Sequence, residues 1–204
     1  MEMNHSPDPS SVGETVFAFD KRVRALVLPY RHSAPAKAID WVSKVGDQAQ
    51  MRVVAGGVIA VGLLRRDPRM IGAGIRMLAA HEVATLAKDW VKERVVRTRP
   101  RNPVPGDAHK PREGHDTRKE KSSFPSGHAT GAFASATAFA AVYPQHALAA
   151  EAAAAGVAAG RIPGCKHYPS DVAAGAAIGI GSAVLVGALG RAAAWIVAGR
   201  TAGR

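Results

Sequence analysis

Residues 172–190 form a run of 19 residues without one charged side chain. This length is close to the ~20 apolar residues that an α-helix needs to cross the hydrocarbon core of a bilayer. Gly175 and Gly179 lie in the run at the four-residue spacing that lets two membrane helices pack with their backbones close together. The run therefore predicts a packed helix that spans a membrane.

Three more apolar blocks precede this run, at residues 53–64, 70–91 and 129–160. The first is short, charged side chains interrupt the second, and Glu151 is the one charge of the third. The sequence Tyr143-Pro144-Gln145 divides the third block into two helices, because proline interrupts helical hydrogen bonding. With no strand-like alternation, the chain is predicted to be all-α, a membrane-embedded bundle of about five apolar helices.

The N-terminal part has a different composition. Residues 1–15, with two prolines and four Ser or Thr, are expected to be a disordered tail, and they lack the pattern of a secretory signal peptide. Residues 16–50 mix apolar and basic side chains, which predicts an amphipathic helical segment lying in a membrane interface. A surface helix of a soluble bundle is the alternative. Residues 16–204 are expected to form a single domain.

The chain is strongly basic, with 27 Lys and Arg against 16 Asp and Glu and a formal net charge of +11. Such an excess suits an anionic partner: nucleic acid, acidic lipid headgroups or a phosphorylated substrate. Cys165 is the single cysteine, which excludes an internal disulfide and a cysteine-built zinc site.

The polar segment 92–127 is rich in prolines and is expected to be a loop, with the first of three polar clusters at its start. In KERVVRTRP, Lys92 and Arg99 are seven residues apart, which would place them on one helix face before Pro100 ends the helix. A lysine and an arginine together suit a phosphate group. A basic surface helix is the alternative for this cluster.

The second cluster is PSGH, at the start of the apolar block that follows the loop. Ser126 is expected to cap the helix and Gly127 to let a ligand approach the backbone. The free amides and positive end of that helix would then face the same point as His128. This arrangement predicts an anion site. A capped helix followed by a surface histidine is the alternative, because it would have the same sequence.

The third cluster is GRIPGCKHYPSD, in which Arg161 follows one apolar helix and Asp171 opens the next. A carboxylate one turn from an imidazole can hold the ring in one tautomer, so Asp171 is predicted to orient His167. A carboxylate at the start of an apolar block also needs a partner, and His167 is the nearest candidate.

If each apolar block crosses once, all three clusters lie on the same side of the membrane. Their residue types predict phosphoryl transfer: His167 attacks phosphorus, and Lys92, Arg99 and Arg161 neutralise the phosphate oxygens. His128 then protonates the leaving oxygen and activates water. No metal or other cofactor is expected, because the cations supply the electrostatic role.

At these residues the chain resembles the type-2 phosphatidic acid phosphatase superfamily, whose signatures are K-x6-RP, PSGH and SR-x5-H-x3-D. All three spacings match and stand in the same order, although Gly160 replaces the usual serine. The first spanning helix of six-helix members is expected to be absent, with the amphipathic segment in its place. The resemblance implies a phosphohistidine intermediate and a phosphorylated lipid substrate. It also implies a multi-pass protein of the cell inner membrane with an extracytoplasmic site and no nucleic-acid partner.

Two other functions fit parts of the sequence. A soluble non-specific acid phosphatase of the same superfamily would use the same residues. A non-enzymatic protein that binds nucleic acid or anionic membranes could be built around residues 92–121, which hold ten Lys and Arg against five Asp and Glu. The oligomeric state is left open by the sequence.

Overall fold

The computed structural model describes residues 9–105, 109–116 and 118–202, and within them the fold is all-α as predicted. Its elements are α1 (Pro9–Val27), η1 (Leu28–Tyr30), α2 (Ala34–Val42), η2 (Ser43–Gly46), α3 (Gln48–Arg65), α4 (Pro68–Lys92), β1 (Val95–Val96), β2 (Arg112–Glu113), α5 (Gly127–Ala140), η4 (Pro144–His146), α6 (Ala147–Ala159) and α7 (Pro169–Ala202). The strands β1 and β2 form a two-residue antiparallel ribbon.

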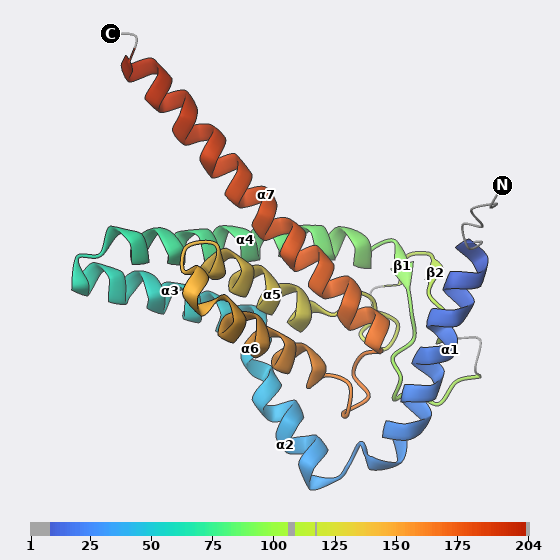
Figure 1. Ribbon diagram of the computed structural model, residues 1–204. Coiled ribbons are helices and arrows are strands. Elements are labelled where there is room, and N and C mark those ends of the chain that lie inside the picture. Colours follow the sequence, from blue (N-terminus) through green and yellow to red (C-terminus); the bar gives the residue numbers. More distant parts are fainter. Residues whose placement is uncertain (1–8, 106–108, 117, 203–204) are drawn as a thin grey trace, which may run out of the picture.

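Helices α3 and α4 lie antiparallel, joined by a tight turn at the end of the bundle far from β1 and β2 (Figure 1). Arg66, in the left-handed conformation with φ of 53°, ends α3. Asp67 caps α4 by accepting hydrogen bonds from the amides of Arg69 at 2.9 Å and Met70 at 3.1 Å. The local sequence therefore fixes this turn.

The third apolar block folds as two helices, α5 and α6, separated by η4 at the predicted break. Helix α7 packs on α5 through the two glycines singled out above. A Cβ on Gly175 would lie 2.5 Å from the carbonyl oxygen of Ser126, and one on Gly179 would clash with the carbonyl oxygen of Thr130. The four-residue glycine spacing is thus confirmed as a close helix contact, and it fixes the start of α7 beside the start of α5.

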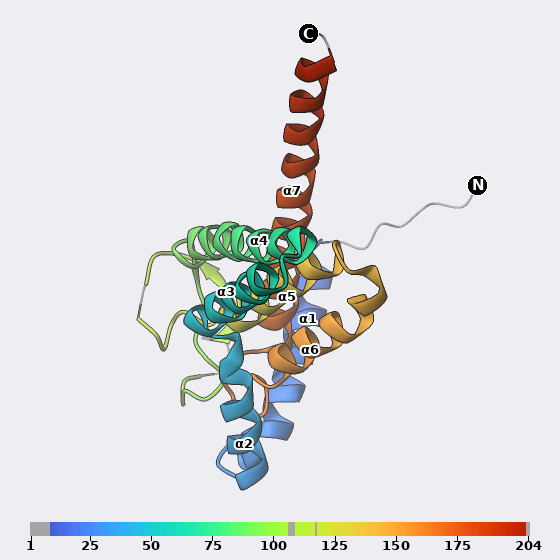
Figure 2. The same ribbon diagram turned by 90° about the vertical axis from the view of Figure 1, so that its left-hand side faces the viewer.

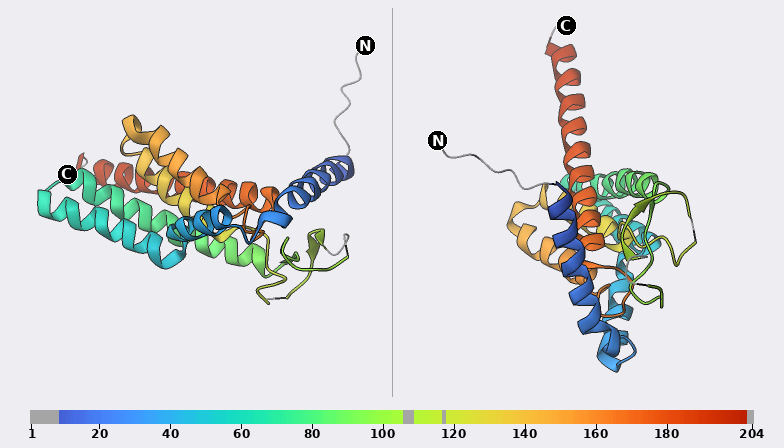
Figure 3. Two further views of the ribbon diagram at one scale, coloured as in Figure 1. Left: turned by 90° about the horizontal axis from the view of Figure 1, so that it is seen from below. Right: turned by 90° about the vertical axis from the view of Figure 1, so that its right-hand side faces the viewer.

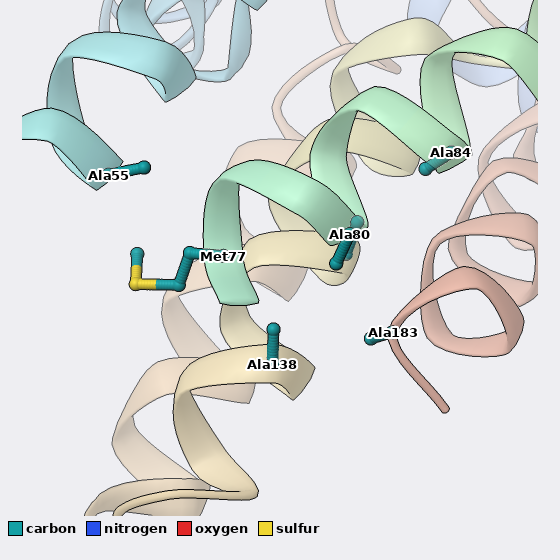
Figure 4. Packing of buried hydrophobic residues seen from close by; sticks show 7 residues of the cluster. Ala55, Met77, Ala80, Ala84, Ala138 and Ala183 are labelled. Carbon is teal, nitrogen blue, oxygen red and sulfur yellow. The ribbon is translucent and has the colours of Figure 1, made fainter. Parts of the chain in front are cut away.

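Small side chains fill the centre of the bundle. Buried alanines from α3, α4, α5 and α7 surround Met77 (Figure 4). Because alanine adds little bulk, these helices approach one another closely, and their ends beside β1 and β2 are held in a fixed arrangement. The labelled members of this cluster are Ala55, Ala80, Ala84, Ala138 and Ala183.

The N-terminal helices wrap around the end of the bundle where the polar loop lies (Figures 2 and 3). Helix α1 is held to that loop by Arg24, whose Nε donates to the carbonyl oxygen of Pro100 at 2.8 Å. The predicted disordered tail is wrong for residues 9–15, because α1 begins at Pro9. The rest of that predicted tail, residues 1–8, lies outside the described residues.

Helix α7 is long and apolar enough to cross a membrane over Pro169–Gly199, with a mean hydropathy of 2.1. Among the described residues it is the one helix that meets this criterion. Helices α5 and α6 contain 14 and 13 residues and rise ~20 Å each at 1.5 Å per residue, less than the ~30 Å hydrocarbon core. The positions of the five apolar helices are therefore confirmed. Among the described residues, α7 is the one that meets the length and hydropathy expected of a membrane-spanning helix.

Candidate active site

The predicted nucleophile, His167, is buried beside the loop that precedes α5. Its Nδ1 lies 2.8 Å from the backbone carbonyl oxygen of Ser123. A carbonyl oxygen can only accept, so Nδ1 carries the proton and donates it, and Nε2 keeps its lone pair. Asp171 Oδ2 lies 3.7 Å from Nδ1, beyond hydrogen-bond distance. The prediction that Asp171 fixes the tautomer is wrong in this detail, because the Ser123 carbonyl does so.

Burial lowers the pKa of the His167 imidazole to about 4, the negative charge of Asp171 opposes this shift, and Arg99 and Lys92 add to it. An imidazole in this environment is neutral at pH 7. His167 therefore presents an unprotonated Nε2, the form that a nitrogen nucleophile requires.

Asp171 is completely buried, and its carboxylate is satisfied by three donors. Oδ2 accepts from the Ser123 hydroxyl at 2.5 Å and from the Tyr168 amide at 2.8 Å, and Oδ1 accepts from Arg97 Nη1 at 2.6 Å. The expectation that His167 is its nearest partner is therefore wrong. A buried carboxylate is retained when it is paired and fully hydrogen-bonded, and Arg97 supplies the charge.

Arg97 is the main residue of this site that the sequence did not reveal. Its side chain is 1% exposed and joins Asp171 to Asp20 of α1, with Nη2 2.6 Å from Asp20 Oδ2. Its guanidinium also lies over the Tyr168 ring, 4.0 Å from the centroid. The helical spacing assumed for this segment did not single out Arg97. In an extended segment that starts at residue 95, alternate residues share a side, which places Arg97 on the same side as Arg99.

Lys92 and Arg99 meet, though not on a helix. Helix α4 ends at Lys92, and a bridge between Arg97 and Ser122 belongs to the extended segment that follows, so the predicted shared helix face is wrong. Lys92 Nζ and Arg99 Nη2 both donate to the carbonyl oxygen of Ser122, at 3.0 and 3.2 Å. The two cations thus converge on one loop residue.

Two further backbone carbonyls hold Arg99. Its Nε donates to the backbone carbonyl oxygen of Lys119 at 2.6 Å, and its Nη1 donates to that of Lys166 at 3.1 Å. Burial lowers the pKa of Arg99 to about 10, helped by the nearby charge of Arg101. Arg99 therefore stays charged at neutral pH in a fixed orientation next to the segment that carries His167.

The start of α5 lies against Asp171. The amide of Ser126 donates to the Asp171 carbonyl oxygen at 3.0 Å, and the first helical hydrogen bond runs from Thr130 to Ser126. Ser126 occupies the cap position, but its hydroxyl makes no capping bond and is buried without a partner, so the predicted cap is wrong. The amides of Gly127 and His128 precede the first helical bond, as orphan donors at a helix start do.

His128 faces η2 and the start of α3. Its Nε2 lies 2.9 Å from Asp47 Oδ1, in contact with the carboxylate but without the geometry of a hydrogen bond. A Cβ on Gly46 would lie 3.3 Å from the His128 Cβ and 2.5 Å from Val157 Cγ1. Only glycine therefore lets η2 approach His128 this closely.

Arg161 is held by the same N-terminal segment. Its Nη1 donates to Asp40 Oδ1 at 2.8 Å and to the Ser43 hydroxyl at 2.9 Å, while its Nε is buried without a partner. A Cβ on Gly160 would lie 2.9 Å from the Ser43 Cβ. Glycine at the position where the family signature has serine thus makes room for Ser43, which gives Arg161 a hydroxyl partner.

The segment 16–50 therefore has a second role besides its amphipathic character. Its three carboxylates, Asp20, Asp40 and Asp47, contact Arg97, Arg161 and His128 respectively. Sequence patterns on one segment could not show these pairings, because each partner lies more than 75 residues away.

A buried neutral imidazole, three fixed cations and a helix start with free amides form the kind of centre that phosphoryl-transfer proteins use. In the described part of the chain, no three His, Cys, Asp or Glu side chains are grouped so that they could hold a metal ion. The polar end of the bundle is therefore the candidate active site.

Comparison with known families gives the same class. The family model of the PAP2 superfamily matches residues 73–195, more than half of the chain, and the chain belongs to this superfamily. A solved structure described as the first transmembrane PAP2 type phosphatidylglycerolphosphate phosphatase from Bacillus subtilis is similar at 21% identity and a TM-score of 0.41, over 88% of this chain and 96% of that chain. Among curated proteins, the comparison finds no match.

Proposed function

We propose that this PAP2 protein is a metal-independent membrane lipid phosphatase that hydrolyses a phosphomonoester or pyrophosphate headgroup through a phosphohistidine intermediate. The observation that carries the proposal is the state of His167, whose Nδ1–H is fixed by the Ser123 carbonyl so that Nε2 is free to attack. Polyprenyl pyrophosphates and glycerophospholipid phosphates are the proposed substrates.

In the proposed first step, His167 Nε2 attacks phosphorus, the N–P bond forms and the P–O bond to the leaving group breaks. Lys92, Arg99 and Arg161 bind the phosphate oxygens as their charge rises, together with the Ser126 hydroxyl and the amide of Gly127. His128 gives its proton to the leaving oxygen. Asp171 supports the positive charge that forms on His167.

In the second step, His128, now neutral, takes a proton from water, and the resulting hydroxide attacks phosphorus. The N–P bond breaks, inorganic phosphate leaves, and both imidazoles return to their starting protonation states. Burial, and then the positive charges of Arg161 and its neighbours, lower the pKa of the His128 imidazole to about 3 in the free protein. The negative charge of a bound phosphate, together with Asp47 in contact with Nε2, is proposed to raise this pKa so that His128 carries a proton when the substrate is bound.

An apolar groove beside His128 supports a lipid as the leaving group. The groove has a volume of about 310 Å³ and runs between α3, α5 and α6, with Val45 and Val157 in its lining. Val157 also meets Gly46 beside His128. A hydrocarbon chain lying in this groove would leave its headgroup oxygen at the histidine that donates the proton.

Exposed apolar side chains support insertion in a membrane. Leu189, Trp195 and Val197 of α7 are 60%, 79% and 62% exposed on the part of the helix that projects beyond the bundle (Figure 1). Water would disfavour such a surface, whereas a bilayer accommodates it. We propose a multi-pass protein of the cell inner membrane with its polar end, and so the active site, on the extracytoplasmic side.

The test uses the full chain, purified in detergent, with phosphate release measured from a polyprenyl pyrophosphate and from phosphatidate, with and without EDTA. We expect turnover by the wild type in both conditions and a loss of at least a thousand-fold in His167→Asn, because asparagine can keep the donor to Ser123 but cannot attack. His146→Asn, at an exposed histidine outside the site, is the matched control.

Equal turnover by the wild type and His167→Asn would overturn the proposed mechanism. Retention of the native chain in the soluble fraction, with hydrolysis of soluble phosphomonoesters only, would instead favour the non-specific acid phosphatase. Binding of anionic vesicles or nucleic acid without any turnover would favour the non-enzymatic function.

A further inference from the structure

The apolar groove beside His128 contains a polar group that the proposed mechanism does not use. Among the described residues that line the groove, Ser135 of α5 is the one with a hydroxyl, and the others are Val, Met, Ala and Phe. Ser135 is 4% exposed, and its Oγ is buried without a hydrogen-bond partner in the described part of the chain. Burying a hydroxyl without a partner costs free energy, so this group indicates a partner outside the chain.

Two other buried hydroxyls of these helices are satisfied by their own helix. Thr130 Oγ1 donates to the carbonyl oxygen of Ser126 at 2.9 Å, and Ser182 Oγ donates to that of Ile178 at 2.8 Å. A bond to the carbonyl four residues earlier is a common one for a hydroxyl within a helix. Ser135 makes no such bond. Its hydroxyl is therefore available to a ligand in the groove.

Ser135 lies at a defined depth in the groove. It follows His128 by seven residues on α5, which places it on the same helix face, about 10 Å farther along the helix at 1.5 Å per residue. Ala132 lies between the two, Phe139 lies one turn beyond Ser135, and both line the groove. A ligand in the groove therefore meets in turn an imidazole, a small side chain, a hydroxyl and an apolar wall.

An ester-linked lipid phosphate has its groups in the same order. Its leaving oxygen is followed by glycerol carbons, then by an ester carbonyl, and then by hydrocarbon. A carbonyl oxygen can only accept and the Ser135 hydroxyl can donate. A hydrogen bond of about 2.8 Å at each end, with the short glycerol link between, suits the distance from His128 to Ser135. An ether oxygen is a poorer acceptor and a prenyl chain has none, so either would leave the hydroxyl without this bond.

We propose that Ser135 is a specificity-determining residue that donates a hydrogen bond to the ester carbonyl of the lipid, so that the protein distinguishes ester-linked from ether-linked chains on the same headgroup. The inference rests on the proposed function for the placement of the leaving oxygen at His128. The discrimination lies in the linkage of the chains and is independent of the residues that bind phosphate.

Steady-state kinetics tests the inference on the full chain, purified in a detergent without carbonyl groups. The substrates are dioctanoyl phosphatidate and its dioctyl ether analogue, which share headgroup and chain length. The quantity measured is the ratio of kcat/KM for the ester to kcat/KM for the ether. The test variant, Ser135→Ala, removes only the hydroxyl. The control, Ser182→Ala, removes a buried hydroxyl that has its partner within α7.

We expect the ratio to fall about five-fold or more in Ser135→Ala, as the loss of one hydrogen bond to a buried acceptor predicts. The value of kcat/KM for the ether should change less than two-fold, and the control should keep the wild-type ratio. An equal change for the ester and the ether, no change for either, or the same fall in the control would overturn the inference while leaving the phosphatase in place.

The affinity for dephosphorylated lipids tests Ser135 without turnover. Calorimetry compares dioctanoylglycerol with dioctylglycerol in the wild type and in Ser135→Ala. Affinity for the ester should fall in the variant by a factor similar to that in the kinetics, and affinity for the ether should not. If the wild type hydrolyses neither lipid phosphate, the proposed function fails, and this comparison still decides on Ser135. Equal affinities of the wild type and the variant for the ester would overturn the inference.

Thermal unfolding distinguishes a ligand-binding hydroxyl from a structural one. Because the Ser135 hydroxyl has no partner in the described part of the chain, the melting temperature of Ser135→Ala should be no lower than that of the wild type. A lower melting temperature would show that the hydroxyl has a partner within the protein, and it would overturn the inference.

Discussion

His167 and Asp171 lie one helical turn apart in sequence, yet it is Ser123 that joins them. The Ser123 carbonyl oxygen accepts from His167 Nδ1 at 2.8 Å, and its hydroxyl donates to Asp171 Oδ2 at 2.5 Å. The tautomer of the histidine is thus set by the backbone, and the carboxylate acts through its charge.

This division predicts unequal effects for two variants. Ser123→Ala keeps the carbonyl and removes only a hydroxyl, so we expect kcat to fall less than ten-fold. Asp171→Asn removes the charge that stabilises a cationic His167, and kcat should fall at least a hundred-fold with little change in KM. Steady-state kinetics on the same lipid measures both, and a larger loss in Ser123→Ala would contradict the assignment.

The pH dependence of activity follows from His167. Because its pKa is about 4 in the folded protein, the proposed nucleophile stays neutral down to that pH. We therefore expect the acidic limb of the profile, where kcat/KM falls as the pH falls, near pH 4. An unperturbed histidine would place that limb near pH 6.5. The profile is measured with the lipid in a detergent whose headgroup does not titrate in this range.

Stability should change with pH through the same group. The folded pKa is below the unfolded value, so the unfolded chain binds the proton more tightly between pH 6.5 and 4. The contribution of His167 to stability therefore falls as the pH falls through this window. In chemical denaturation, His167→Asn should show a smaller loss of stability than the wild type from pH 7 to 4, and equal slopes would contradict the assignment.

Arg97 is predicted to position the site without touching the substrate. Arg97→Lys keeps the charge but cannot bridge Asp20 and Asp171 at once, so a buried carboxylate loses its partner. We expect a loss of ~3–5 kcal/mol in the free energy of unfolding. For Arg118→Lys, at the exposed Arg118–Asp116 pair, the loss should be under ~1 kcal/mol. Denaturant titration measures both.

Kinetic constants of Arg97→Lys distinguish a positioning role of Arg97 from a general loss of stability. Below the melting temperature, Arg97→Lys should lower kcat while KM stays within about two-fold, because the proposed nucleophile His167 loses its fixed surroundings and the proposed phosphate-binding cations remain. A change in KM alone would show that Arg97 contacts the substrate.

Asp47 is predicted to support proton donation by His128. For Asp47→Asn we expect a ten-fold or greater loss of turnover with an alkyl phosphate, whose leaving oxygen needs a proton. With p-nitrophenyl phosphate, whose leaving group needs none, the loss should be less than two-fold. Asp116→Asn, at a carboxylate that contacts Arg118, is the control. Equal losses with both substrates would assign Asp47 a structural role.

The proposed topology can be tested with single cysteines at the two ends of the bundle. Lys119 is exposed in the polar loop and Arg65 is exposed at the turn between α3 and α4, while the native Cys165 is fully buried. An impermeant maleimide should label Lys119→Cys in intact cells and Arg65→Cys only after permeabilisation. The reverse pattern would place the site in the cytoplasm.

The sequence was sufficient for what is periodic or fixed by spacing. Apolar blocks placed α3 to α7, Pro144 marked the break between α5 and α6, and the spacing of Gly175 and Gly179 located a close helix contact. The order of Lys92, Arg99, His128 and His167 along the helix ends was enough to indicate that they gather at one end.

The rest depends on pairings that no local pattern encodes. The extended course that begins at Val95 places Arg97 between two carboxylates, and a helical interpretation of KERVVRTRP could not show it. In the same way, Ser43 contacts Arg161 only because α2 and η2 fold back on Gly160. The glycine that looked like a departure from the family signature is explained by this contact.

The three aspartates of the N-terminal segment have a consequence for how the working unit is defined. Asp20, Asp40 and Asp47 all lie outside residues 73–195, the stretch that matches the family. A protein trimmed to that stretch would keep all eight predicted site residues. It would lose the carboxylates that contact Arg161 and His128, two of those eight, and the one that contacts Arg97, which supports Asp171. The working unit is therefore larger than the stretch that matches the family, because the segment in front of it supplies the carboxylates that hold Arg97, Arg161 and His128.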